Sequence, residues 1–250
     1  MQSIRAVLVI IVLASCAPLP TATQLPTSQI VHIGLTPALR SWQSRFNLCA
    51  DQMTGVGLAF YEAPQAEQPA PLLNYDFFVQ LSGDIPEQAF STSLGVENLV
   101  WIIHVDNPAS QVTPDQLLSI YEGKITGWED INPSTEAADL PITPWMYASN
   151  DSLYTAFRAV VWGERAYPPQ ASLAPDPAAM LEAVSTDPGA IGFLPESWLN
   201  GNQPASDVRA IQLVEQNEPK LAALPVIIVS TKEPTGASRS LLLCVLETLR

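Results

Sequence analysis

Short apolar segments with the composition of β-strands alternate with helical segments along most of the chain. The segments rich in β-branched and aromatic residues are 28–34, 55–62, 75–84, 98–108, 140–146, 190–195, 208–214 and 224–232. Between them the apolar residues recur every three or four positions, as at Leu39, Trp42 and Phe46, and so share one helix face. This alternation is typical of α/β proteins in which helices flank parallel sheets. The long apolar run in 98–108 predicts a strand buried in such a parallel sheet.

The clearest helix boundaries occur in the middle of the chain. Thr113, Pro114 and Gln116 have the spacing of a capping box with proline at the first helical position. Gly123 is expected to end this helix. Thr36, which also precedes a proline, is expected to cap the helix that follows the first strand.

The N-terminus has the order of regions found in secretory signals. Arg5 precedes an apolar run over 6–14, which is too short to cross a bilayer as a helix. Leu13-Ala14-Ser15-Cys16 resembles the bacterial lipobox, which implies that residues 1–15 are a lipoprotein signal peptide and that Cys16 carries the lipid. Residues 16–28, rich in Pro, Thr and Gln, are interpreted as a tether. The alternative is an ordinary signal peptide with a chance cysteine.

The charge balance restricts the partners. The formal net charge is -14 at pH 7, and removal of residues 1–15 takes away one Arg, which gives -15. Such a chain will not bind nucleic acid through its overall field, and its attachment to a membrane must come from the lipid anchor. With 47% hydrophobic residues the chain can build a sizeable core, and the roughly 220 residues after the tether suit one large domain or two lobes.

Signals of catalysis are sparse. The chain has no G-x-S-x-G, H-E-x-x-H or phosphate-cradling glycine motif, so we predict no enzymatic activity, no metal and no cofactor. His32 and His104 both lie in apolar strands and are interpreted as core residues. Cys49 and Cys244 are left with two alternatives, a disulfide or two buried free thiols.

Three loops are suited to an anionic or polar ligand, because each lies where a strand ends in a polar turn or a helix start. They are Gly34–Leu39, Gln80–Asp84 and Ser149–Ser152. The candidate ligand-binding residues in them are Thr36, Ala38, Leu39, Gln80, Ser82, Ser149, Asn150, Asp151 and Ser152. The alternative is that these are ordinary helix caps.

Two segments resemble one known family. "VDNPASQVTPDQLLSIYEGKITGWEDINP", which ends at Pro133, and "STDPGAIGFLP", which ends at Pro195, resemble the phosphate-type solute-binding proteins of bacterial ABC transporters. The resemblance implies a type II periplasmic-binding fold, in which two α/β lobes, each a mainly parallel sheet flanked by helices, close on a ligand at their hinge. It places lobe 1 at 29–102 with 223–250 and lobe 2 at 103–222. With the terminal helix packed on lobe 1, a bond between Cys49 and Cys244 becomes plausible.

The resemblance also implies a function. The chain would be an extracytoplasmic, membrane-anchored lipoprotein and a monomer, which captures phosphate or a related small oxyanion or polar solute for an ABC permease. The family's Gly-Ser-Gly-Thr loop corresponds here to Asn150-Asp151-Ser152-Leu153, and no Arg lies in the three loops. A carboxylate there repels a phosphate dianion unless it accepts a proton from the ligand. Two alternatives stay open: a degenerate binding protein that acts as a sensor or interaction module, and a secreted hydrolase that uses Asp151 or another acidic residue.

Overall fold

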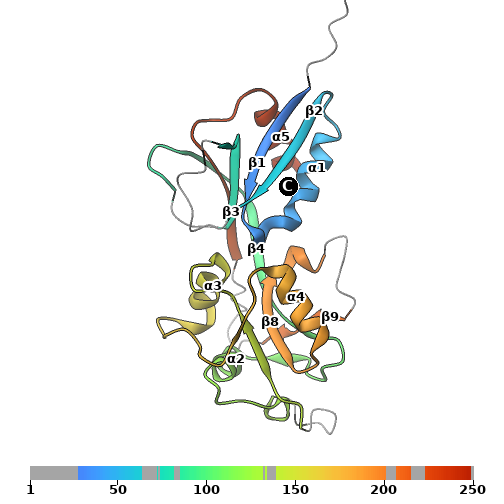
Figure 1. Cartoon of the computed structure of the whole chain (residues 1–250), viewed down its shortest axis with the longest axis vertical. Helices are drawn as coiled ribbons and strands as arrows, with labels where there is room; N and C mark the ends of the chain where they lie inside the picture. The colour runs from blue at the N-terminus through green and yellow to red at the C-terminus, as the bar shows by residue number, and fades with distance from the viewer. Residues whose placement is uncertain are drawn as a thin grey trace, which may run out of the picture.

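In the computed structural model the chain forms two α/β lobes arranged end to end, and the strand β4 (Phe90–His104) runs through both (Figure 1). The structure describes residues 28–63, 72, 74–81, 85–131, 133, 139–200, 207–214 and 223–248. The predicted signal peptide, Cys16, the tether as far as residue 27, and Ser82 lie outside these residues. Within them, no helix is long and apolar enough to cross a membrane.

Lobe 1 is built on a mixed sheet of five strands. In spatial order they are β2 (Val56–Glu62), β1 (Gln29–Leu35), β3 (Phe77–Leu81), β11 (Ala223–Ser230) and the first part of β4. β1 is parallel to β2 and β3, whereas β11 is antiparallel to β3 and β4. Because side chains alternate between the faces of a strand, Val31 and Ile33 are fully buried on one face, while Ile30 on the other is exposed.

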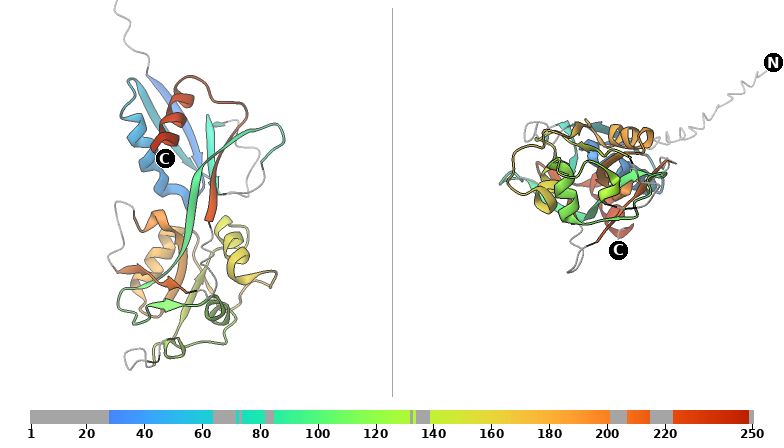
Figure 2. Two further views of the ribbon diagram at one scale, coloured as in Figure 1. Left: turned by 180° about the vertical axis from the view of Figure 1, so that it is seen from behind. Right: turned by 90° about the horizontal axis from the view of Figure 1, so that it is seen from below.

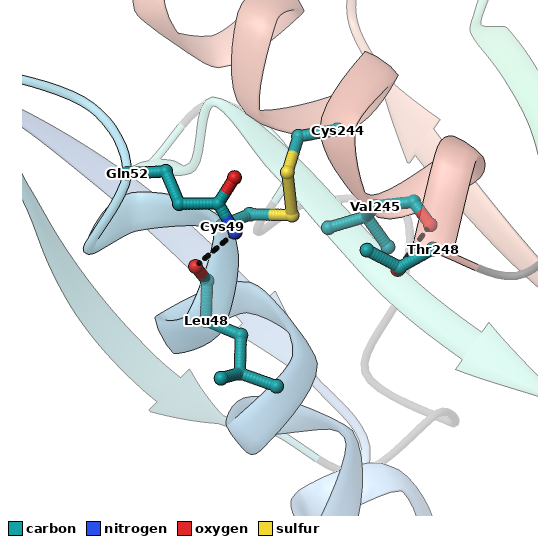
Figure 3. The surroundings of a disulfide bond; sticks show 6 residues. All are labelled: Leu48, Cys49, Gln52, Cys244, Val245 and Thr248. Carbon is teal, nitrogen blue, oxygen red and sulfur yellow. Dashed lines mark hydrogen bonds between the residues drawn. A yellow bond between two sulfur atoms is a disulfide. The ribbon is translucent and has the colours of Figure 1, made fainter.

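Two helices cover the buried face of the lobe 1 sheet. They are α1 (Gln43–Ala50), which continues the 3₁₀-helix η1 (Pro37–Trp42), and α5 (Gly236–Thr248); both lie on the same side, as Figure 2 (left) shows. Cys49 in α1 and Cys244 in α5 form a disulfide with their Cα atoms 5.8 Å apart (Figure 3). The bond therefore joins the first helical segment of the fold to the last, 195 residues further along the chain.

β4 changes its partner halfway along its length. Asn98 is the last residue that pairs with β11, opposite Ala223, and Leu99 is the first that pairs with β8, opposite Pro195. One continuous strand thus belongs to the sheets of both lobes. The prediction that this strand lies in a parallel sheet is wrong, because its pairings with β11, β8 and β9 are all antiparallel. Its apolar character reflects burial on both faces, which does not depend on strand direction.

Lobe 2 has a second mixed sheet with helices around it. Its strands are β9 (Val208–Ala210), the end of β4, β8 (Ala190–Pro195), β6 (Thr143–Met146) and β7 (Ser172–Leu173), and β5 (Gln111–Val112) forms a separate pair with β10 (Gln212–Leu213). The helices are α2 (Pro114–Tyr121), α3 (Ser152–Phe157) with the π-helix η5 (Arg158–Trp162), and α4 (Pro177–Thr186), with the 3₁₀-helices η4 (Trp128–Asp130) and η6 (Glu196–Trp198).

The helix boundaries predicted from caps are confirmed. The Thr113 hydroxyl accepts a hydrogen bond from Gln116 N at 3.2 Å, and the Gln116 side chain accepts one from Thr113 N at 2.9 Å. Gly123 follows with a φ of 70°, the left-handed conformation that ends helices. Thr36 differs: it stands at the cap position of η1, yet its side chain makes no capping hydrogen bond.

Candidate functional site

A cavity of about 290 Å³ opens between the two lobes. Nine of the described residues line it: Thr36, Pro37 and Ala38 from lobe 1, and Ala148, Asn150, Asp151, Ser152, Leu173 and Pro175 from lobe 2. They follow the carboxyl ends of β1 and β6 or lie at and beyond the end of β7. Ligands of open α/β sheets bind at this edge, and the volume is at the lower end of the usual range for ligand pockets, about 300–1,000 Å³.

Thr36 lines this cavity and carries a buried hydroxyl. Its backbone is fully engaged, since its N–H donates to Val79 O at 3.2 Å and its carbonyl accepts from Leu39 N at 2.9 Å. The residue is 2% exposed, and Oγ1 has no hydrogen-bond partner in the part of the chain that the structure describes. A buried hydroxyl left unpaired costs roughly 1–3 kcal/mol. A ligand that forms a hydrogen bond with Oγ1 would recover this energy.

Asp151 faces the same cavity from lobe 2. It caps α3, and its Oδ1 accepts a hydrogen bond from Leu153 N at 2.7 Å. Burial raises the pKa of this carboxyl above its ordinary value, and the negative charge of Asp176 adds to the effect, while the bond from Leu153 N opposes it. The carboxyl group is therefore held in a setting that disfavours its charged form.

No Lys or Arg is among the nine lining residues. Arg40 in η1 stands nearby, but its guanidinium is held by Glu62, with Nε–Oε1 at 2.5 Å and Nη2–Oε2 at 2.7 Å. Arg40 Nη2 also lies 3.8 Å from Asp176 Oδ2, so this side chain reaches from lobe 1 to the start of α4 in lobe 2. Among its described lining residues, the cavity thus contains one acidic group and no basic one.

A second set of polar contacts joins the lobes near η1 and η6. Glu97 is 4% exposed, and its carboxylate accepts from Trp42 Nε1 at 2.6 Å and from Ser197 N at 2.9 Å. Trp198 Nε1 donates to Ala38 O at 2.8 Å. Because Glu97 lies next to the point where β4 passes between the lobes, these contacts surround the hinge.

The structure brings five of the predicted ligand-binding residues together around the cavity: Thr36, Ala38, Asn150, Asp151 and Ser152. Of the other predicted residues that the structure describes, Leu39, Gln80 and Ser149 do not line it. Leu39 is fully buried in the lobe 1 core, and Ser149 is not among the lining residues. Gln80 lies inside β3, opposite Ile227, and is 1% exposed. The strand extends to Leu81, so Gln80 belongs to the sheet and not to a loop. That the five bind a ligand stays a prediction.

Several residues of this region were not predicted from the sequence. Leu173 and Pro175 line the cavity. They were missed because β7 has only two residues, too few for an alternation of apolar and polar residues to be recognised. The ion pair between Arg40 and Asp176 was also missed, because the two residues are far apart in the chain. In the described ranges, no group of three or more His, Cys, Asp or Glu side chains has the geometry of a metal site.

Residues 78–240 match the PBP superfamily domain. Among solved structures, the chain is similar to a Clostridium perfringens protein with bound phosphate, assigned as a phosphate ABC transporter substrate-binding protein, with a TM-score of 0.69, 18% identity and coverage of 87% of this chain and 93% of that one. It is also similar to an ABC-type phosphate transport receptor from Vibrio cholerae, with a TM-score of 0.57, 16% identity and coverage of 88% of this chain and 94% of that one. A third similar structure is the reduced OxyR regulatory domain from Pseudomonas aeruginosa, with a TM-score of 0.63, 8% identity and coverage of 89% of this chain and 98% of that one.

At these identities the structural similarity shows the fold alone, a two-lobed arrangement shared by transport proteins and regulatory domains. The comparison with curated proteins found no match.

Proposed function

The chain belongs to the PBP superfamily, and we propose that it is the extracytoplasmic solute-binding component of an ABC importer. Two solved structures with the same fold are named for phosphate transport, which supports a transport role. In this proposal lobe 1 (29–102 with 223–250) and lobe 2 (103–222) close over a small solute and present it to a permease. A solute that contacts both lobes favours the closed arrangement over the open one.

The observation that carries this proposal is the position of Thr36 and Asp151 on opposite sides of one cavity. The first residue belongs to lobe 1 and the second to lobe 2, and each has polar capacity that the protein does not use fully. A polar solute between them would satisfy Thr36 Oγ1 and donate to the Asp151 carboxyl group. Phosphate or another small polar solute are the ligands to test, and phosphate must then carry a proton toward Asp151.

We further propose that the protein is a lipoprotein. Cys16 would carry the lipid, and residues 16–28 would give the lobes freedom to reach the permease. Replacement of Cys16 by Ser is expected to move the protein from the membrane fraction to the soluble fraction. Retention of the Cys16→Ser protein in the membrane would contradict lipid attachment at this residue.

A sensor or interaction module is the second candidate. It is favoured by the contacts that join the lobes directly, Arg40 with Asp176 and Trp198 with Ala38, because these stabilise one arrangement of the lobes from within the protein. In this function a partner recognises the closed form, and transport is not involved.

The test is a calorimetric titration of the full chain, purified from membranes in detergent, with phosphate and a panel of small polar solutes. Small-angle scattering on the same samples measures whether the lobes close. We expect saturable binding together with a smaller radius of gyration, and loss of both in Thr36→Ala and Asp151→Asn. Ser119→Ala and Asp115→Asn on α2 are the matched controls. Binding that survives both cavity substitutions would refute this site.

A further inference from the structure

We propose that the cavity takes a small organic solute with a protonated amine, which binds to Asp151, rather than an inorganic oxyanion. This inference rests on the proposed function and narrows it to a class of solute. The charges of the described residues around the cavity have the wrong sign for an anion.

In the part of the chain that the structure describes, the charged groups around the cavity sum to a negative value. Asp151 lines it, and Asp176 is close enough to raise the pKa of Asp151. Arg40 is the cation placed to offset them, but Glu62 holds its guanidinium with two hydrogen bonds. Of the three carboxylates, those of Asp151 and Asp176 are therefore left without a full counter-charge. An oxyanion entering here meets repulsion, whereas an ammonium group supplies the missing positive charge.

Burial of Asp151 strengthens the preference of the cavity for a cation over an anion. Buried charges are paired in stable proteins, because an isolated ion loses its hydration without compensation. Asp151 accepts one hydrogen bond, from Leu153 N to Oδ1, and no ion pair of this carboxylate is found in the described residues. A protonated amine would complete its coordination with a charge-assisted hydrogen bond. The ligand, and not the protein, would then provide the cation of the pair.

The shape of the cavity agrees with an organic solute. Pro37, Ala38, Ala148, Leu173 and Pro175 form an apolar part of the wall. The volume of about 290 Å³ equals that of roughly ten molecules of liquid water, which is more than a tetrahedral oxyanion fills. Carbon atoms of a solute can cover these apolar residues and remove them from water.

The remaining polar groups set further requirements. Thr36 Oγ1 can donate or accept one hydrogen bond, and Asn150 and Ser152 line the same cavity. A solute with a hydroxyl or carbonyl group separated by a short carbon chain from its amine would contact Asp151 and Thr36 together. Such a solute bridges the lobes, as closure requires.

The experiment compares probes that share one carbon skeleton and differ in charge. Ethanolamine, ethylene glycol and glycolate are titrated into the full chain beside phosphate and sulfate, with calorimetry for affinity and small-angle scattering for closure. We expect ethanolamine to bind at least about tenfold more tightly than ethylene glycol, since a charge-assisted hydrogen bond is stronger than a neutral one. Glycolate, phosphate and sulfate are expected to bind more weakly than either.

Two variants test whether Asp151 is the residue that favours ethanolamine. Asp151→Asn is expected to reduce the binding of ethanolamine to no more than that of ethylene glycol, while Asp115→Asn on the exposed start of α2 leaves the preference for ethanolamine unchanged. Tighter binding of phosphate than ethanolamine, with closure, would overturn this inference and leave the proposed function intact. If none of the five probes binds or compacts the protein, the inference fails, and the proposed function is decided by the wider panel of small polar solutes.

Discussion

Arg40 and Asp176 face each other across the opening between the lobes, with Nη2 of the guanidinium 3.8 Å from Oδ2 of the carboxylate. Arg40 follows β1 in lobe 1, and Asp176 caps α4 in lobe 2, where its Oδ1 accepts from Ala179 N at 2.9 Å. Both side chains therefore have fixed positions within their own lobes. The contact between them depends on how far the lobes are closed.

Replacement of Arg40 by Gln should open the lobes without unfolding the protein. The ion pairs of Arg40 are about one-third exposed, at 37% and 33% for Arg40 and Glu62, and pairs of this kind contribute roughly 0–1 kcal/mol. We expect a Tm change of no more than a few degrees and a larger radius of gyration by small-angle scattering. Arg239→Gln, which removes the exposed pair with Glu233, is the control. An unchanged radius would show that this contact does not hold the lobes together.

Replacement of Glu97 by Gln should destabilise the hinge. One of the two carboxylate oxygens becomes an NH₂ group and then faces a donor, either Trp42 Nε1 or Ser197 N. The loss of a buried hydrogen bond with an unpaired group is expected to cost roughly 1–3 kcal/mol of unfolding free energy, measured in urea. Glu182→Gln on the exposed face of α4 should change it by less than about 0.5 kcal/mol. Equal effects of the two substitutions would argue against the role of Glu97.

Removal of the disulfide should destabilise the whole protein. Because Cys49 and Cys244 are 195 residues apart, the bond restricts most of the unfolded chain. Replacement of both cysteines by Ala is expected to lower the unfolding free energy by roughly 2–5 kcal/mol. Reduction of the unmodified protein should give a similar loss, and the variant should not respond to the reductant. A stability of the unmodified protein that is independent of reductant would contradict the bond.

Stability should fall with rising pH through the titration of Asp151. Burial and the charge of Asp176 raise its pKa, so the folded protein keeps this proton at pH values where the unfolded chain, with an ordinary Asp pKa of about 4, has lost it. Stability is therefore lost as the pH rises from about 4 through the folded pKa. Asp151→Asn cannot titrate and can still cap α3, so we expect it to lose less stability between about pH 4 and 7.

The comparison is made by urea unfolding at both pH values. Asp115→Asn, at an exposed position, should keep the slope of the unmodified protein. A slope for Asp151→Asn equal to that of the unmodified protein would contradict the prediction.

Local signals in the sequence predicted most of the helices and strands, while contacts between distant residues were out of its reach. The capping box at Thr113 and the alternating strands are encoded within a few residues, so they were found. The antiparallel direction of β4 depends on which segments meet it, and an apolar run is the same for either direction. Thr36 and Asp151 line the same cavity because of how the two lobes pack. The sequence could name both as candidates, but only the fold places them at one cavity.

Thr36→Val should separate stability from binding. Valine has the shape of threonine without its hydroxyl, so the substitution removes a buried oxygen that has no partner in the described residues and keeps the packing. We expect the protein without solute to become more stable by up to about 1–3 kcal/mol, because the desolvation of Oγ1 is no longer incurred. Thr113→Val is the matched control, because its hydroxyl accepts the capping bond from Gln116 N, and it should lose about 1 kcal/mol. Thr36→Val should at the same time bind the solute more weakly in a calorimetric titration. A loss of stability in Thr36→Val would mean that Oγ1 has a partner within the protein, and Thr36 would then not be available to a ligand.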